Sequence, residues 1–316
     1  MPLIRRTMAR SSSPREMSDN LANLMARAGP NRPLVDALLG ATVIVADPEK
    51  AASAVDSVLG LRRRATGRLE SGAPFVTVAA ARADRGMIRF AKGDESVAVE
   101  DLRRGWASVE LVVRDVDGLA ERLRRSDQFH LHTGPVTFDL TEQGSNVHRA
   151  AIAWGPGGLL MGFTMAVTQP RGRRFTEVAH EVGPVFSVGL RTPDLDKTSA
   201  FYRGALGMET LLEVSWRSGD WHRIFNVPEG EEAALRLLKG EGQGTGLGTI
   251  EVQSFPARLL GPPALPGIAS VTYRTRDAHA ALAAAERVGE VVEAQAGSFT
   301  LIGDCGERLE VTEAAW

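Results

Sequence analysis

Apolar positions along the chain change their spacing in a fixed order, which is clearest between residues 185 and 255. A run of β-branched and apolar residues at Val185–Leu190 predicts a strand. Asp194 then supplies a helix cap, apolar positions recur at helical spacing, and Gly207 marks the predicted helix end. Residues 220–227 fit either a strand or a short helical turn. Three further strands are predicted over Glu209–Trp216, Ala233–Lys239 and Thr249–Phe255.

The same order recurs three more times. Each copy has an opening strand, an aspartate-initiated helix and further strand-forming segments, and the other three open at Thr42–Ala46, Ser108–Val113 and Ser270–Arg274. Repetition at this scale predicts four βαβββ modules in an α+β fold. One such unit cannot cover both faces of a curved sheet. We therefore expect the modules to pair into two domains, each a cupped mixed sheet around one cleft.

The length of 316 residues also favours two domains, because it exceeds the size at which a single core usually stops growing. Pairing modules in chain order predicts an N-terminal domain over 34–168 and a C-terminal domain over 183–316, which is expected to hold the main cleft. The Pro- and Arg-containing stretch 169–182 is then the linker. Residues 1–33 are rich in Arg, Ser and Met and are expected to form a flexible arm.

Composition narrows the class of partner. The chain is 43% hydrophobic and 24% charged, with a formal net charge of −2, so no global field would recruit nucleic acid. No apolar run approaches the roughly 20 residues of a membrane span. The single cysteine, Cys305, cannot form an internal disulfide, which favours a cytoplasmic protein. We expect a small-molecule substrate or ligand as the partner, with no nucleic acid and no membrane, and a homodimer stays open.

Residues 192–208 (Thr-Pro-Asp-Leu-Asp-Lys-Thr-Ser-Ala-Phe-Tyr-Arg-Gly-Ala-Leu-Gly-Met) closely resemble the first helix of glyoxalase-type modules in the vicinal oxygen chelate superfamily. That superfamily includes glyoxalases, extradiol dioxygenases and bleomycin-resistance proteins. Residues 248–252 and 303–311 resemble its closing strands. The resemblance covers roughly Leu38 to Thr312, and four modules at this length also look like the plan of two-domain extradiol dioxygenases.

The resemblance implies a divalent-metal site with a first-strand histidine or glutamine and a last-strand glutamate. In the C-terminal half these positions fall on Ser187, Glu251, Ser270 and Glu310. In the N-terminal half they fall near Gly40, Arg89, Ser108 and Gly162, so no ligand site is expected there. Because none of these positions holds a histidine, their side chains suit iron or zinc poorly. The expected cofactor is therefore either none, or Mg²⁺ or Mn²⁺ held by Glu251 and Glu310 with waters.

Glu251 and Glu310 are the candidate catalytic residues. Each stands between two apolar residues on a closing strand, so each is expected to face the cleft rather than the covering helix. Two facing carboxyl groups can split their pKa values, and one then acts as the base and the other as the acid. The alternative is that both are solvated strand glutamates.

Further side chains are candidates for substrate binding. Two serines occupy positions where the resemblance implies metal ligands, and aromatic and basic residues gather in the C-terminal half, where they would suit a flat organic ligand. For each of them a structural role is the competing interpretation: core for the aromatics, small polar filler for the serines, a solvated site for the histidine. The candidates are Ser187, Ser270, Trp216, Trp221, His222, Arg223 and Tyr273.

Three functions are compatible with these patterns. The leading hypothesis is a lyase or isomerase that moves a proton beside a carbonyl group in a small carbonyl-containing or aromatic compound. The alternative is a non-catalytic binder of the bleomycin-resistance type, which would sequester a planar ligand. The third is a ring-cleaving extradiol-type dioxygenase with an atypical metal site, which inherits only the architecture.

Overall fold

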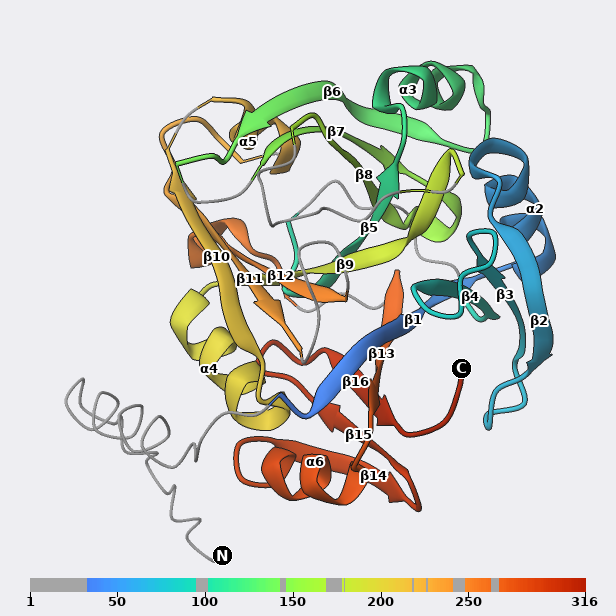
Figure 1. Cartoon of the computed structure of the whole chain (residues 1–316), viewed down its shortest axis with the longest axis vertical. Coiled ribbons are helices and arrows are strands. Elements are labelled where there is room, and N and C mark those ends of the chain that lie inside the picture. Colours follow the sequence, from blue (N-terminus) through green and yellow to red (C-terminus); the bar gives the residue numbers. More distant parts are fainter. Residues whose placement is uncertain are drawn as a thin grey trace, which may run out of the picture.

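The computed structural model describes residues 33–94, 102–142, 146–168, 178, 180–217, 219–225, 227–240, 248–262 and 267–316. Four βαβββ modules follow one another along the chain, as the repeat predicts (Figure 1). The first comprises β1 (Val35–Val45), α2 (Pro48–Leu59), β2 (Arg62–Arg68), β3 (Pro74–Ala79) and β4 (Met87–Lys92). The second comprises β5 (Gly105–Val113), α3 (Val116–Arg125), β6 (His130–Asp139), β7 (Val147–Trp154), η1 (Pro156–Gly158) and β8 (Leu160–Ala166).

The third module comprises β9 (Val182–Thr192), α4 (Leu195–Leu206), β10 (Glu209–Trp216), α5 (Asp220–Phe225), β11 (Ala233–Lys239), β12 (Thr249–Ser254) and η2 (Ala257–Leu259). The fourth comprises β13 (Ile268–Thr275), α6 (Ala278–Ala285), β14 (Glu290–Gln295), β15 (Ser298–Ile302) and β16 (Arg308–Thr312). The segment that fitted either a strand or a helical turn is therefore helical over Asp220–Phe225. The expected arm at 1–33 lies outside the described residues except for its last position, as does most of the expected linker.

The first helix of every module starts at an aspartate, as expected. Asp47, Asp115, Asp194 and Asp277 each accept hydrogen bonds from backbone N–H groups of the following turn. Gly207 ends α4 in the left-handed conformation at φ 64°. None of the helices in the described residues is both long and apolar enough to cross a bilayer.

The strands form two eight-stranded sheets, and their composition corrects the expected pairing. One sheet has the order β14-β15-β16-β13-β1-β4-β3-β2, so it joins the first module to the fourth. The other has the order β10-β11-β12-β9-β5-β8-β7-β6, so it joins the second module to the third. Residues 34–168 and 183–316 are therefore not separate domains. Each sheet takes one module from each half of the chain (Figure 1).

The pairing is fixed where opening strands meet. β1 runs antiparallel to β13, and β5 runs antiparallel to β9. The repeated apolar pattern does not encode partner choice, because every module exposes the same kind of opening strand as an edge. Side chains at the junction of the opening strands encode the choice of partner. The buried Asp36 on β1 accepts hydrogen bonds from Arg274 Nε and Arg276 Nε, each at 2.8 Å.

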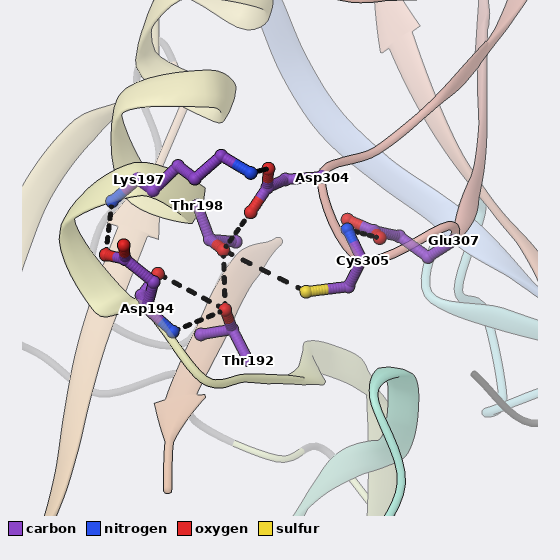
Figure 2. A network of polar contacts seen from close by, with 7 residues as sticks. All are labelled: Thr192, Asp194, Lys197, Thr198, Asp304, Cys305 and Glu307. Atoms are coloured by element: carbon purple, nitrogen blue, oxygen red, sulfur yellow. Dashed lines mark hydrogen bonds and ion pairs between the residues drawn. The ribbon is translucent and has the colours of Figure 1, made fainter. Parts of the chain in front are cut away.

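The two sheets also meet through a polar network between α4 and the loop before β16 (Figure 2). Thr198 Oγ1 donates to Asp304 at 3.0 Å, and Lys197 forms an ion pair with the same carboxylate. Buried Glu307 accepts from the Cys305 backbone N–H at 2.8 Å and from the Tyr202 hydroxyl. Burial raises the pKa of Glu307 to about 7. The single cysteine of the chain is thus buried at this interface and faces no cleft.

Candidate functional site

The sheet of the second and third modules curves around a hollow that we call the β5/β9 cleft. It encloses about 1010 Å³ of empty space, part of which is open solvent. Its walls are apolar side chains from both modules, whereas its floor is polar. The walls include Phe138, Leu140, Ile152, Phe186, Leu212, Val214, Ile224, Phe225, Leu235 and Leu237.

The floor brings together carboxyl groups from two modules. Glu110 lies on β5 and Glu251 on β12, and β9 runs between these strands. Two strand spacings amount to about 10 Å, which two glutamate side chains span when nothing stands between them. The intervening residue, Gly189, is paired with Glu251, and a Cβ added to it would lie 2.2 Å from Ser108 Oγ. Glycine at this position therefore leaves room for the Ser108 hydroxyl and the Gln253 amide above β9.

A hydrogen bond joins the two carboxyl groups of this pair. Burial raises the pKa of Glu110 well above its ordinary value, and the charge of Glu251 and a hydrogen bond to it raise it further. Burial also raises the pKa of Glu251, while hydrogen bonds from Glu110 and Gln253 oppose that rise. Glu110 is thus the protonated partner and Glu251 the carboxylate, as in other closely spaced carboxyl pairs.

A cation completes the floor. Gln253 Nε2 donates to Glu251 at 2.8 Å, and Arg191 Nε donates to Gln253 Oε1 at 3.4 Å. Arg191 is 7% exposed, and burial lowers its pKa to about 10, so it stays charged at neutral pH. Within the described part of the chain no ion pair forms at Arg191. Its charge is therefore available to an anionic oxygen in the cleft.

His148 lines the same cleft from β7. It is 8% exposed, and burial lowers its pKa to about 4. The imidazole is therefore neutral at physiological pH. The cleft thus combines a protonated acid, a carboxylate, an arginine and a neutral histidine.

Glu310 lies elsewhere, which corrects the expectation of a Glu251–Glu310 pair. It faces a second hollow, the β1/β13 cleft, which is formed by the first and fourth modules. There its Oε2 accepts from Thr272 Oγ1 at 2.9 Å. The reason is the module pairing: closing strands β12 and β16 belong to different sheets. The expectation that the N-terminal half contributes no ligand site is also corrected, because Glu110 lies in that half.

The serines and the tyrosine are placed in three different environments. Ser187 is fully buried beneath the β5/β9 cleft, where its hydroxyl donates to the Thr249 carbonyl at 3.2 Å. Ser270 lines the β1/β13 cleft. Tyr273 is core, and its hydroxyl donates to the Gly248 carbonyl at 3.0 Å.

Ile224 and Phe225 of α5 belong to the cleft wall, but the described candidate residues of this region, Trp216, His222 and Arg223, are not part of the cleft lining. Trp216 stacks on Phe225 with ring centroids 5.5 Å apart. His222 is buried, and its Nδ1 lies 2.9 Å from the Pro228 carbonyl oxygen. Arg223 is exposed and forms an ion pair with Asp220. Trp221 belongs to α5, but its side chain lies outside the described part. The described members of this group support the wall and do not touch the polar floor.

The donor set does not fit a divalent metal. At the positions where the superfamily resemblance implies ligands, this cleft offers Ser108, Gly162, Ser187 and Glu251. Glu251 shares its proton with Glu110, and Arg191 adds a positive charge to the same floor. Among the described residues, no three His, Cys, Asp or Glu side chains are grouped to hold a metal ion. The chemistry of this floor is that of a proton-sharing pair.

Comparisons with known proteins agree with the fold. Residues 185–296 match the profile of the Glyoxalase/Bleomycin resistance protein/Dioxygenase superfamily. The match covers the third module and part of the fourth. Glyoxalase I from Zea mays superposes with a TM-score of 0.66 at 15% identity, covering 88% of this chain and 92% of that chain. A proposed dioxygenase from Bacillus subtilis superposes with a TM-score of 0.62 at 15% identity, covering 89% and 85%.

These superpositions confirm the two-sheet glyoxalase fold over nearly the whole chain. At such identities they show the fold alone, and superfamily members differ in chemistry. No curated protein sequence matches the chain. The residues that can indicate a function are therefore those on the floor of the cleft.

Proposed function

We propose that the β5/β9 cleft catalyses proton transfer beside the carbonyl group of a small, largely apolar compound. The observation that carries this proposal is the hydrogen-bonded Glu110–Glu251 pair, in which the pKa of both carboxyl groups is raised. A carboxylate whose pKa is raised is a stronger base at neutral pH than a solvated one. The apolar walls would hold the carbon skeleton and turn the carbonyl group toward the floor.

In this mechanism Glu251 removes the proton from the carbon next to the carbonyl. The electrons of that C–H bond form the enolate double bond, and the carbonyl oxygen gains negative charge. Arg191 and the proton of Glu110 stabilise that oxygen. Return of the proton to the opposite face gives epimerisation, return to another carbon gives isomerisation, and loss of a neighbouring leaving group gives a lyase.

Exchange of carbonyl-adjacent protons for deuterium tests the proposal on a simple ketone, whatever the natural substrate is. The probe is 2-tetralone, an apolar aromatic ketone, followed by proton NMR in deuterated, mildly acidic buffer where uncatalysed exchange is slow. We expect the protein to accelerate exchange. Glu251→Gln keeps the shape but removes the base, and should lower the rate by about 10²–10⁴-fold.

Glu310→Gln is the matched control, because it makes the same change on the equivalent strand of the other cleft. It should leave the exchange rate unchanged. An unaltered rate in Glu251→Gln, or an equal loss in both variants, would remove the proposal.

The apolar wall favours a second candidate, a non-catalytic binder of flat apolar molecules. Ten of the lining side chains named above are apolar, and the carboxyl groups and the arginine lie on the floor. Calorimetry separates the two candidates. Stoichiometric binding of 2-tetralone with no acceleration of exchange would favour the binder.

A further inference from the structure

The β1/β13 cleft has an arginine where a metal ligand is implied by the superfamily resemblance. Arg89 lies on β4, the closing strand of the first module, and faces the hollow together with Ser270 and Glu310. A guanidinium is permanently positive, so it repels a cation and attracts an oxygen anion. An arginine at this position therefore disfavours a metal ion there.

An aromatic side chain of the chain itself occupies this cleft. The Arg89 guanidinium carbon lies 4.0 Å from the ring centroid of Trp316 and 4.6 Å from that of Phe75. Both distances are within the range of cation–π contacts. The hollow thus already accommodates a planar bicyclic ring held against an arginine.

The strand beneath the ring is shaped for it. Gly40 on β1 would, with a Cβ added, lie 2.3 Å from Cζ3 and 2.7 Å from Cη2 of Trp316. The same Cβ would meet the Met87 carbonyl oxygen at 2.3 Å, so glycine is needed for strand pairing as well. The ring therefore lies directly on the backbone of the sheet, as a flat ligand would.

The Trp316 indole nevertheless leaves hydrogen-bond donors in the cleft without partners. Arg89 Nε and Trp316 Nε1 are both buried without a hydrogen-bond partner among the described residues. Each unfilled buried donor costs roughly 1–3 kcal/mol. Arg308 is paired with Glu293, and Glu310 accepts a hydrogen bond from Thr272. The charge of Glu310 acts on Arg89, but among the described residues no hydrogen bond joins these two side chains. The missing group is an acceptor that reaches Arg89.

We propose that the β1/β13 cleft is a second ligand site, which takes a planar aromatic carboxylate in place of the Trp316 indole. The ligand ring replaces the indole against Arg89 and over Gly40. Its carboxylate accepts the hydrogen bond that Arg89 Nε lacks. This site is separate from the Glu110–Glu251 pair and does not depend on the function proposed for it.

The test uses 2-naphthoate as the ligand and the full chain labelled with 5-fluorotryptophan. The chain has five tryptophans, and Trp316→Ala identifies the fluorine resonance of residue 316 by its absence. We expect 2-naphthoate to shift that resonance toward the position of a solvent-exposed fluorotryptophan. A naphthoate complex that leaves the Trp316 resonance in place would overturn the proposal.

Calorimetry supplies the second measurement. In Trp316→Ala the ligand no longer competes with the indole, so its dissociation constant should fall at least tenfold. Adding Arg89→Gln to that variant should reverse the gain, and uncharged 2-naphthalenemethanol should bind at least tenfold more weakly than 2-naphthoate. Equal affinities in Trp316→Ala and the unsubstituted chain would contradict the displacement.

Glu110→Gln shows which cleft is occupied. It changes only the β5/β9 cleft and should leave naphthoate affinity unaltered. A tenfold change in that variant would place the ligand in the wrong cleft and refute the second site. Thermal melts of each variant confirm that the comparison is made on folded protein.

Discussion

Glu110 donates a hydrogen bond to Glu251, although the two residues belong to different modules and lie on either side of β9. Neither half of the sequence contains the pair. The contact exists only because β5 and β9 meet edge to edge. Gly189 on β9 leaves room for Ser108 and for Gln253, which donates to Glu251. Substitutions at the pair, at this glycine and at the contacts that hold the modules together should therefore have distinct effects.

The exchange rate should depend on pH through the shared proton. Glu251 must be charged, so the rate falls on the acid side as it gains a proton. Glu110 must stay protonated, and burial raises its pKa, so the rate falls on the alkaline side only well above the usual carboxyl range. Glu110→Gln keeps a donor that cannot ionise, and should remove the alkaline limb of a 2-tetralone pH–rate profile. If the alkaline limb persists in this variant, the titration of a group other than Glu110 causes it.

Gly189→Ala should disable the cleft while leaving the fold intact. The added Cβ would lie 2.2 Å from Ser108 Oγ and 3.0 Å from Gln253 Nε2, which positions Glu251. We expect at least a tenfold loss of exchange activity, with partial recovery when Ser108→Ala removes the nearer atom. Gly261→Ala is the matched control, because its Cβ would come no closer than 3.6 Å to its neighbours. Equal activities of the two glycine variants would argue against a need for open space above β9.

The contact between the sheets should weaken as pH rises toward neutrality. Burial raises the pKa of Glu307 to about 7 from its ordinary value of 4.5, so the folded protein binds this proton more tightly than the unfolded chain. The stabilising contribution is therefore complete below the unfolded pKa and is lost as pH rises through about 7. Urea unfolding of Glu307→Gln should show a shallower decline of the unfolding free energy over this window, by roughly 3 kcal/mol. An identical pH dependence in both proteins would exclude Glu307 as the source.

Asp36→Asn should weaken the pairing of the first and fourth modules. Burial opposes ionisation of Asp36, but hydrogen bonds and charge from Arg274 and Arg276 prevail and lower its pKa. The resulting stabilisation is present above the unfolded pKa and is lost as pH falls through the folded value. We expect a loss of about 1–3 kcal/mol in urea unfolding at neutral pH, which shrinks in acid. Asp56→Asn, which breaks an exposed pair with Arg62, should cost less than about 1 kcal/mol.

Local structure is readable from the sequence because it rests on local rules. The aspartate caps, the glycine at 207 and the strands over Glu209–Trp216 and Ala233–Lys239 all appear as predicted. Glu251 lines a cleft, as expected from the alternation of strand residues between two faces. These features depend on neighbours within a few residues, which a single sequence displays directly.

The sequence does not show which modules pair with each other. The wrong prediction of a Glu251–Glu310 pair follows from this. Four similar modules can pair in chain order, first with second and third with fourth, or in nested order, first with fourth and second with third. The repeated pattern fits both. The nested order separates Glu310 from Glu251 and brings in Glu110. Glu110 stands between Val109 and Leu111 on a predicted strand, so alternation alone could have placed it on the same face as Ser108. The superfamily resemblance does not point to Glu110, because its implied ligand positions fall on other residues.

Because of this nested pairing, the chain cannot be divided at its midpoint into two halves that fold independently. Severing the backbone near residue 175 would leave β1 and β5 on one piece and β13 and β9 on the other, each stripped of its hydrogen-bonding mate. Neither piece could close a cup alone, whereas the two together carry every interface needed to rebuild both. The halves of this chain are thus equivalent to two obligate subunits that happen to be translated as one, and both clefts exist only at the junction between them.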